Sequence, residues 1–494
     1  MLISGLALGA VLGFVMQRGR FCVTGFLRDI FTQRSWRGFV ALLIVISVHA
    51  IGLAALTSAG VITPEYKELA PLAVIIGGVI FGLGIVLAGG CASGTWYRSG
   101  EGLIGSWIAL VFYALSAAAM KTGFLGGLQD SLKDRTVGLT SIHASLGISI
   151  WPLVIALSAL TAYLAVRYLR EEFSGPRPVT LAPRKSGLAH ILAEKPWHVY
   201  ATAAIVGVLG VIAWPLSAAT GRNDGLGITT PSSNLANYVV TGDTERFDWG
   251  VLLVLGILVG SFIAAKASGE FRLRVPDATQ GARSVVGGIF MGVGAAWAGG
   301  CTVGNGMVQT SLFSYQGWLA LASIAAGVAI AAKLWLKPSA PSLNDVPSTP
   351  STTNDTAVSA TAPVTSAATS PVSLPGSEGA GAAGTEASPL AGAFAVAPVA
   401  LLERSVVKQD DGKLKPLGGG RYELDTVGAV CPFPLIEAKD AINKIEVGEE
   451  LVIPFDCTQA TDAIPRWAAK DGHEVTNFEQ TGEAGWTISV RRGR

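Results

Sequence analysis

Five cysteines are the residues of this 494-residue chain whose type and spacing point to chemistry. Two of them, Cys91 and Cys301, each follow a Gly-Gly pair and stand three residues before another glycine. Glycine lets the backbone leave a helix, and the exposed N–H groups of such turns and of helix N-termini bind anions. Each Ala-Gly-Gly-Cys-x-x-Gly run is therefore interpreted as half of an anion site. The secondary candidates in these two runs are Gly90, Gly94, Gly300, Gly304 and Asn305.

A third cysteine, Cys22, lies in Gly-Arg-Phe-Cys-Val-Thr-Gly and is also bracketed by glycines. A thiol is a weak donor and a soft acceptor, so it suits a ligand with a terminal sulfur better than chloride or phosphate. Three such thiols along a path would bind an anion weakly and repeatedly, as permeation requires. The neighbouring Arg18 and Arg20 either attract an anion or act as positive-inside anchors, and three further arginines in the same segment favour anchors.

Two alternatives remain for these three thiols. Membrane cysteines often act only as small hydrophobic residues in helix packing. Three thiolates can also bind Cu(I) or Zn(II), but neither Gly-Gly-Cys run stands in a His-rich or Met-rich stretch. We therefore expect no metal site and no cofactor.

The fourth cysteine, Cys431, stands in Cys-Pro-Phe-Pro between an expected strand and an expected helix. Proline is favoured at the first position of a helix, which places Cys431 at the helix N-cap. The N–H groups and dipole of a helix start stabilise a thiolate. Cys431 is thus the candidate catalytic residue, a nucleophile that accepts a sulfane sulfur as a persulfide. Cys457 ends the next expected strand and either lies near Cys431 or only packs.

The elements that must position the first three thiols are membrane helices. Half of the residues are hydrophobic and only 14% are charged, against about 25% in soluble domains. Apolar runs of roughly 17–25 residues are long enough to cross a bilayer as helices. Nine such spans are expected, near 2–16, 38–60, 71–90, 103–120, 148–167, 199–217, 249–267, 284–300 and 316–336.

The orientation of these spans follows from the charge of their connections. Segments rich in arginine and lysine follow the first, fifth and seventh spans. Positive loops stay in the cytoplasm, so we expect a multi-pass protein of the inner membrane with a periplasmic N-terminus and a cytoplasmic C-terminus. The first 20 residues lack the pattern of a cleaved signal peptide and are interpreted as mature protein.

An internal repeat links the two Gly-Gly-Cys runs. Residues 77–94 and 287–304 are identical at nine of eighteen aligned positions. They end the third and eighth spans, and an odd-numbered and an even-numbered span cross the membrane in opposite directions, so the two copies are inverted relative to each other. This arrangement is typical of the inverted repeats of secondary transporters.

Composition divides the chain into three regions. Residues 1–337 form the transmembrane domain, and residues 338–417 are an Ala/Ser/Thr/Pro-rich linker that cannot bury enough apolar surface to fold. Residues 418–494 are expected to form a small domain. The expected fold is thus an all-α polytopic membrane protein with nine helices in an inverted repeat, followed by an α+β two-layer sandwich with the order β-α-β-α-β-β.

Two family resemblances agree with this division. Residues 1–337 resemble the YeeE/YedE (TsuA) family of thiosulfate transporters, on the runs GRFC at 19–22, AGGCASGT at 88–95 and AGGCTVGNG at 298–306. The resemblance implies nine helices in two inverted halves and a thiosulfate path lined by Cys22, Cys91 and Cys301. Residues 418–494 resemble the TusA/SirA-like (TsuB) sulfur carriers on Cys-Pro-x-Pro at 431–434 and the DCTQATDAIP run that follows, which implies a persulfide on Cys431.

The function expected from these features is uptake of thiosulfate across the inner membrane, with sulfur accepted by the fused domain. Alternatives are a transporter of another sulfur-containing anion, a membrane-anchored sulfurtransferase, and a metal or redox sensor. The chain is expected to be primarily a transporter, and a sulfurtransferase activity of the C-terminal domain stays open. Expected partners are thiosulfate, the lipid bilayer and cytoplasmic sulfur-relay proteins. A net charge of +1 gives no reason to expect nucleic-acid binding.

Overall fold

The computed structural model describes residues 2–336 and 414–493. Both stretches belong to one compact unit. The predicted linker, residues 338–417, lies outside the described residues except for its last four positions, which form part of a strand.

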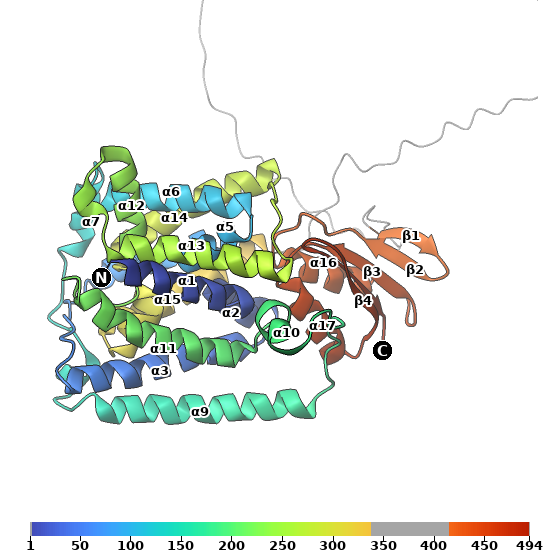
Figure 1. Cartoon of the computed structure of the whole chain (residues 1–494), viewed down its shortest axis with the longest axis horizontal. Coiled ribbons are helices and arrows are strands. Elements are labelled where there is room, and N and C mark those ends of the chain that lie inside the picture. Colours follow the sequence, from blue (N-terminus) through green and yellow to red (C-terminus); the bar gives the residue numbers. More distant parts are fainter. Residues whose placement is uncertain (1, 337–413, 494) are drawn as a thin grey trace, which may run out of the picture. The chain divides into compact units, whose positions relative to one another are not determined.

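Long helices make up the first stretch (Figure 1). They are α1 (Ile3–Arg18), α3 (Arg37–Ser58), α4 (Pro71–Leu87), α6 (Ile104–Lys121), α9 (Trp151–Ser174), α11 (Val199–Ala218), α13 (Trp249–Ser268), α14 (Ala278–Ala298) and α15 (Tyr315–Trp335). Shorter helices lie between them: α2 (Val23–Thr32), α5 (Ala92–Gly100), α7 (Gly126–Lys133), α8 (Ile142–Ser145), α10 (Gly187–Ala193), α12 (Thr229–Thr241), η1 (Thr244–Arg246) and η2 (Gly304–Gln309).

Eight segments of the described residues are long and apolar enough to cross a membrane, by length and composition. Two of them, Ile3–Thr32 and Pro71–Gly100, are broken helices that combine α1 with α2 and α4 with α5. The predicted span at 284–300 corresponds to α14, which is 21 residues long but is not among the eight. Its first turns carry polar residues, including Arg283, so the predicted number of nine is approximate.

Glycines set the closest helix contacts. On α1, Gly9 and Gly13 face the carbonyl oxygens of Leu253 and Ile257 on α13, and Gly256 and Gly260 of α13 face the backbone of α1 in return. Figure 1 shows α1 and α13 side by side. Pairs of small residues four apart let two backbones approach closely in a membrane, and a Cβ atom at these positions would collide with backbone.

The two repeat helices, α4 and α14, pack against each other in opposite directions. A Cβ atom on Gly77 would lie 2.7 Å from the carbonyl oxygen of Gly294, and one on Gly84 would lie 2.8 Å from that of Gly287. In the repeat, Gly77 corresponds to Gly287 and Gly84 to Gly294, so each contact maps onto the other when the copies are exchanged. This packing supports a two-fold relation between these two helices, while an inverted repeat of the whole membrane region stays a prediction.

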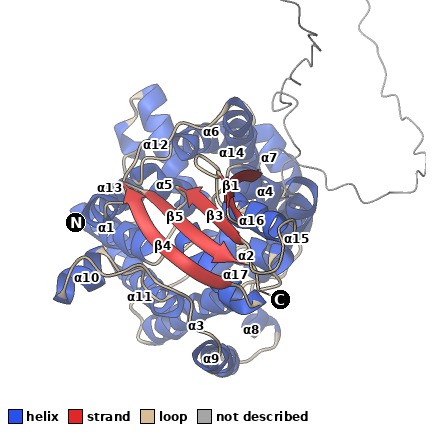
Figure 2. Cartoon of the chain, turned by 90° about the vertical axis from the view of Figure 1, so that its right-hand side faces the viewer, coloured by secondary structure: helices blue, strands red, loops and turns tan. Residues whose placement is uncertain are grey.

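The C-terminal stretch forms a two-layer α+β fold. Its elements are β1 (Leu414–Gly418), β2 (Arg421–Leu424), α16 (Phe433–Ile442), β3 (Glu450–Phe455), α17 (Ala460–Asp471), β4 (Glu474–Gly482) and β5 (Gly485–Arg491). The strands form one mixed sheet in the order β1-β2-β3-β5-β4 (Figure 2). The predicted order is present from β2 onward, and β1 is an additional edge strand.

Strand β1 was not expected because it contains Pro416 and leads into three glycines. Gly418, Gly419 and Gly420 all have positive φ, a conformation that glycine adopts without a steric penalty. They form the turn that lets β1 pair antiparallel with β2. Proline is tolerated there because β1 lies at the edge of the sheet.

Candidate functional site

All three membrane cysteines lie where a helix breaks and a new helical segment begins. Cys22 precedes α2, Cys91 precedes α5 and Cys301 follows α14. In each case the cysteine carbonyl oxygen accepts a hydrogen bond from the N–H four residues later, at 2.8–3.0 Å. The first N–H groups of a new helix have no partner within it, so each thiol lies beside backbone donors.

The sharp turns before Cys91 and Cys301 depend on the first glycine of each Gly-Gly pair. Gly89 and Gly299 have φ of +70° and +78°, whereas Gly90 and Gly300 are not among the positive-φ residues. A side chain is strained at such angles. The glycine two residues before each thiol therefore ends the preceding helix with a residue in the left-handed conformation.

Cys22 and Cys91 lie together in the structure. Their thiols are close enough to interact with each other, and both are buried. A Cβ atom added to Gly94 would lie 3.4 Å from Sγ of Cys91 and 3.8 Å from Sγ of Cys22. Gly94 therefore leaves space beside both sulfur atoms.

Cys301 lies at a different helix break, the one after α14. Side-chain hydrogen bonds of Asn305 stabilise this break. Asn305 Nδ2 donates to the carbonyl oxygens of Ala298, at 2.9 Å, and Gly300, at 3.0 Å. Its Oδ1 accepts a 3.0 Å hydrogen bond from Gln316 on α15. Through these bonds Asn305 caps the end of α14 and stabilises the turn that carries Cys301. Gly304, by contrast, has open space where a Cβ would be.

Two threonine hydroxyls near these thiols are buried without a hydrogen-bond partner among the described residues. They belong to Thr24, two residues after Cys22, and Thr302, next to Cys301. A buried hydroxyl without a partner costs free energy, so a polar ligand at these positions would relieve that cost. Tyr113 of α6 is buried as well, and its hydroxyl donates to Thr229 at 2.8 Å.

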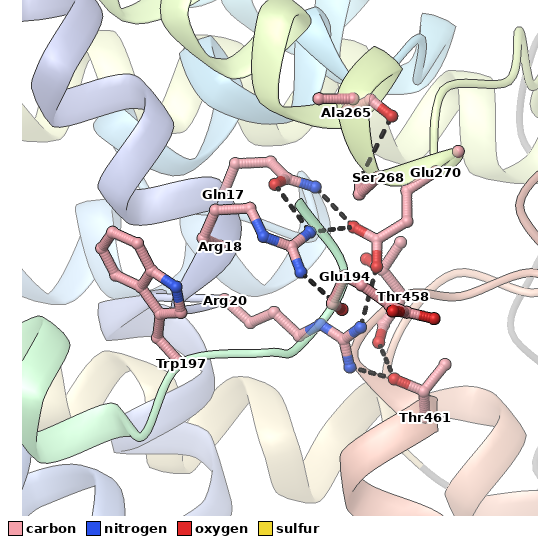
Figure 3. A network of polar contacts seen from close by, with 12 residues as sticks. Gln17, Arg18, Arg20, Glu194, Trp197, Ala265, Ser268, Glu270, Thr458 and Thr461 are labelled. Carbon is pink, nitrogen blue, oxygen red and sulfur yellow. Dashed lines mark hydrogen bonds and ion pairs between the residues drawn. The ribbon is translucent and has the colours of Figure 1, made fainter. Parts of the chain in front are cut away.

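The arginines before Cys22 belong to a buried ion cluster (Figure 3). Glu270 accepts from Gln17 at 2.6 Å, from Arg18 at 3.2 Å and from Arg20 at 3.0 Å. Burial by itself would raise the pKa of Glu270, but Arg20 and Arg18 outweigh it and hold the pKa below its usual value. Arg20 also donates to Thr461 of α17. These contacts are buried ion pairs, which the interpretation of Arg18 and Arg20 as positive-inside anchors did not predict.

Replacing Glu270 by glutamine is expected to destabilise the protein strongly. The change leaves Arg18 buried with a neutral partner, and breaking a buried ion pair costs about 3–5 kcal/mol. Thermal unfolding in detergent should show the loss as a lower Tm. The matched control is Arg167→Gln, which removes an exposed pair with Glu171 and should leave the Tm unchanged. Equal Tm values for Glu270→Gln and wild type would contradict this assignment.

Cys431 and Cys457 form a disulfide with their Cα atoms 6.0 Å apart. Strands β2 and β3 are parallel neighbours, so the loops that follow them meet at one edge of the sheet. Cys431 lies in the loop after β2, one residue before the N-cap of α16. Cys457 lies between β3 and α17 and is buried, whereas Cys431 is partly exposed.

Cys431 also borders two cavities. One is lined by Thr24, Arg28 and Gly89 together with Cys431. The other, about 60 Å³ in volume, is lined by Arg98, Glu101, Arg274, Ser284, Cys431 and Cys457, among other residues. The loop residue before Cys431, Val430, lies against Gly89, so the Cys431 loop reaches the break that carries Cys91.

The larger cavity is rich in donors that have no partner among the described residues. They are the Ser284 hydroxyl and two guanidinium nitrogens of Arg274. Arg274 Nε lies 4.0 Å from a carboxylate oxygen of Asp456, too far for a hydrogen bond. Arg98 donates to the carbonyl oxygen of Gly89 and thereby caps the end of α4. An oxyanion of suitable size would find both positive charge and unused donors in this cavity.

Glu101 is the acidic group of this cavity that titrates near neutrality. It follows the Pro71–Gly100 span, and burial raises its pKa to about 7 against the opposing effects of Arg98 and Arg274. The other charges acting on it are Glu270, which raises its pKa, and Arg20, which lowers it. Below about pH 7 Glu101 is neutral, and the charge of the arginines is available to an anion.

Anion uptake is therefore expected to increase as the pH falls from about 8 to 6. Above the pKa of about 7 the Glu101 carboxylate offsets the charge of Arg98 and Arg274, and below it that offset is lost. The Glu101→Gln variant should keep the low-pH affinity throughout, which a KM for uptake measured at several pH values would show. A variant whose KM follows the same pH profile as wild type would rule out Glu101 as the titrating group.

Sequence patterns missed several residues of this site. Glu101, Arg274 and Tyr113 stand outside the cysteine motifs, and Arg274 was counted only as a loop charge that orients the spans. The sequence also did not show which glycine of each Gly-Gly pair has a positive φ, and in the structure these are Gly89 and Gly299. The several arginines around the helix break at Cys22 indicated a charged site. Their acidic partner, Glu270, could not be identified because it lies about 250 residues away in the sequence.

These features define a multi-pass helical protein of the membrane type joined to a small α+β domain with a disulfide-bonded cysteine pair. The sequence profile described as "Sulphur transport" matches residues 18–330, and that described as "Sulfurtransferase TusA" matches residues 422–492. The first match covers more than half of the chain. The chain therefore belongs to the sulphur transport family and carries a TusA domain in the same polypeptide.

Curated relatives match the two regions separately. The thiosulfate transporter TsuA of Escherichia coli K12 is 51% identical over 328 residues, which are 66% of this chain and 93% of the relative. The thiosulfate transporter TsuA of Spirochaeta thermophila is 32% identical over 335 residues, 65% of this chain and 94% of the relative. The putative sulfur carrier protein TsuB of E. coli K12 is 59% identical over 70 residues, 14% of this chain and 93% of the relative.

Proposed function

We propose that this protein imports thiosulfate through a path lined by Cys22, Cys91 and Cys301 and passes its sulfane sulfur to Cys431. The observation that carries the proposal is the recurrence of one local geometry at three thiols, each at the start of a new helical segment. The similarity to two thiosulfate transporters over most of their length supports thiosulfate as the substrate. A location in the inner membrane, with the N-terminus in the periplasm and the carrier domain in the cytoplasm, completes the proposal.

Thiosulfate suits these sites because its two ends differ. The terminal sulfur accepts weak S–H contacts from thiols, and the sulfonate oxygens accept from backbone N–H groups and from the unpaired hydroxyls of Thr24 and Thr302. Cys22 and Cys91 form one binding station, and Cys301 belongs to another at the end of the antiparallel helix α14. Several weak stations favour passage over tight binding.

At the carrier domain, the Cys431 thiolate attacks the sulfane sulfur of thiosulfate. The bond between the two sulfur atoms of thiosulfate breaks, sulfite leaves with the bonding electrons, and Cys431 keeps the sulfane sulfur as a persulfide. Arg274, Arg98 and the Ser284 hydroxyl line the cavity beside Cys431 and suit the departing oxyanion. This reaction needs the disulfide with Cys457 to be reduced first.

Uptake of labelled thiosulfate into vesicles that contain the purified full-length chain tests the proposal. Thiosulfate should accumulate inside and sulfite should appear, whereas excess sulfate, which lacks the terminal sulfur, should compete poorly. Uptake blocked equally by sulfate and thiosulfate would favour transport of sulfur oxyanions in general. An absence of uptake together with sulfite production would favour a membrane-anchored sulfurtransferase.

A further inference from the structure

We propose that Cys457 is a second catalytic residue, which resolves the persulfide on Cys431 and releases the sulfur as hydrogen sulfide. The inference rests on the proposed function, because a persulfide must first form on Cys431. It adds an activity: the carrier domain would discharge inorganic sulfide by itself instead of only handing a persulfide to another protein.

The position of Cys457 is fixed by the sheet and does not depend on the disulfide. Thr426, after β2, donates through its N–H to the carbonyl oxygen of Pro454, at 3.0 Å, and through its hydroxyl to the same oxygen, at 2.9 Å. The N–H of Gly428 donates to Asp456 Oδ1 at 3.0 Å. These bonds join the loops that carry the two cysteines, so the thiols stay close when the disulfide is reduced.

The two cysteines differ in exposure as their proposed roles require, with Cys431 accepting the sulfur and Cys457 attacking the persulfide. Cys431 is partly exposed and borders both cavities, so it can meet an incoming anion. Cys457 is only 4% exposed and packs in the carrier core. A buried thiol is protected from thiols in solution. Of these two cavities, Cys457 borders only the larger, which it shares with Cys431, and the sulfur of Cys431 to which it is bonded is its nearest reaction partner.

A purely structural disulfide does not fit this pair. The bond consumes the thiol that the proposed function uses as its nucleophile, so a permanent disulfide would prevent sulfur acceptance. The described carrier fold also has a hydrophobic core of its own around Phe455, Ile464 and Trp486. Disulfides of cytosolic proteins are usually transient, with catalytic or redox-sensing roles, which agrees with a bond that forms and is reduced in each cycle.

The chemical step balances without an added reactant. The Cys457 thiolate attacks Sγ of Cys431, a bond forms between these two sulfurs, and the bond from Sγ of Cys431 to the sulfane sulfur breaks. The sulfane sulfur leaves with the electron pair and takes the proton of the Cys457 thiol as HS⁻. The sulfane sulfur is reduced by two electrons and the two cysteines are oxidised to the disulfide. A cellular thiol then reduces the disulfide by thiol–disulfide exchange.

The test uses the full-length chain in detergent, reduced, desalted and kept without oxygen. One portion receives thiosulfate, and a second receives inorganic polysulfide, which can load Cys431 without any thiosulfate chemistry. Sulfite and sulfide are measured in the first portion. After both are desalted, mass spectrometry of the peptides with Cys431 and Cys457 records persulfide or disulfide. The variants are Cys457→Ser and Cys457→Ala, with Thr476→Ser on β4 as the control.

The wild type and the control should release sulfide in step with sulfite and end with the Cys431–Cys457 disulfide. Both Cys457 variants should release sulfite but keep the persulfide, with sulfide release at least about tenfold slower until a thiol is added. Persulfide retained by wild type with a free Cys457 thiol would overturn the inference, as would variants that release sulfide at the wild-type rate. If both variants misfold, the wild-type measurements alone decide between these outcomes. Absence of sulfite with thiosulfate, but disulfide formation with polysulfide, would instead contradict the proposed function.

Discussion

Thiosulfate uptake should fall by roughly ten- to hundredfold when Cys91 is replaced by alanine. The thiol of Cys91 shares a buried site with Cys22, and loss of one buried donor costs about 1–3 kcal/mol. Because Gly94 leaves space beside both sulfurs, alanine enlarges this space and removes the S–H group that faces the ligand. Cys22→Ala should give a similar loss, and the double variant less than the sum, since the two thiols act on one ligand.

Initial uptake rates in vesicles measure this effect, with the amount of protein in each preparation checked. Cys91→Ser separates hydrogen bonding from sulfur contact, because the hydroxyl donates but is a harder acceptor than the thiol. We expect an intermediate rate for this variant. Val111→Ala, on the exposed side of α6, is the control for general damage to the membrane region. Normal uptake by Cys91→Ala and Cys301→Ala would show that the thiols only fill space.

Replacing Cys431 by serine should abolish sulfite production and persulfide formation, a loss on the order of a thousandfold or more for removal of a nucleophile. Serine keeps the size and the hydrogen-bonding capacity of the side chain, but its hydroxyl is not ionised near neutral pH. The initial rate of thiosulfate entry into vesicles should be retained, because Cys22, Cys91 and Cys301 are unchanged. Sulfite assays and mass spectrometry of the Cys431 peptide measure the loss.

The comparison of Cys431→Ser with Cys457→Ser places each cysteine in the sequence of steps. The first variant should make neither sulfite nor persulfide, whereas the second should make both and stop there. Sulfite production that survives in Cys431→Ser would move the nucleophile to another residue. Uptake that stops completely in Cys431→Ser would show that entry is coupled to sulfur transfer on the carrier.

Local patterns were sufficient for much of the architecture. Long apolar runs gave the membrane helices because a span needs a fixed length of apolar chain. The Gly-Gly-Cys repeats indicated the helix breaks, since glycine marks backbone that leaves a helix. Alternation of strands and helices around Cys-Pro-Phe-Pro predicted the carrier fold from β2 onward, but not the edge strand β1, whose proline and glycines are typical of a loop.

The sequence by itself determined that this chain is a membrane protein with thiols at helix breaks, joined to a domain with a cysteine at a helix start. Only the tertiary structure decided which of these groups meet. It places Cys22 beside Cys91 and pairs Arg18 with Glu270. It also lets Asn305 cap the end of α14 and links Cys457 to Cys431 by a disulfide. Breaks and spans follow from residues near each other in the chain. These contacts join segments up to about 250 residues apart, which pack together only because glycines let the helices approach and because parallel strands bring their loops to one edge.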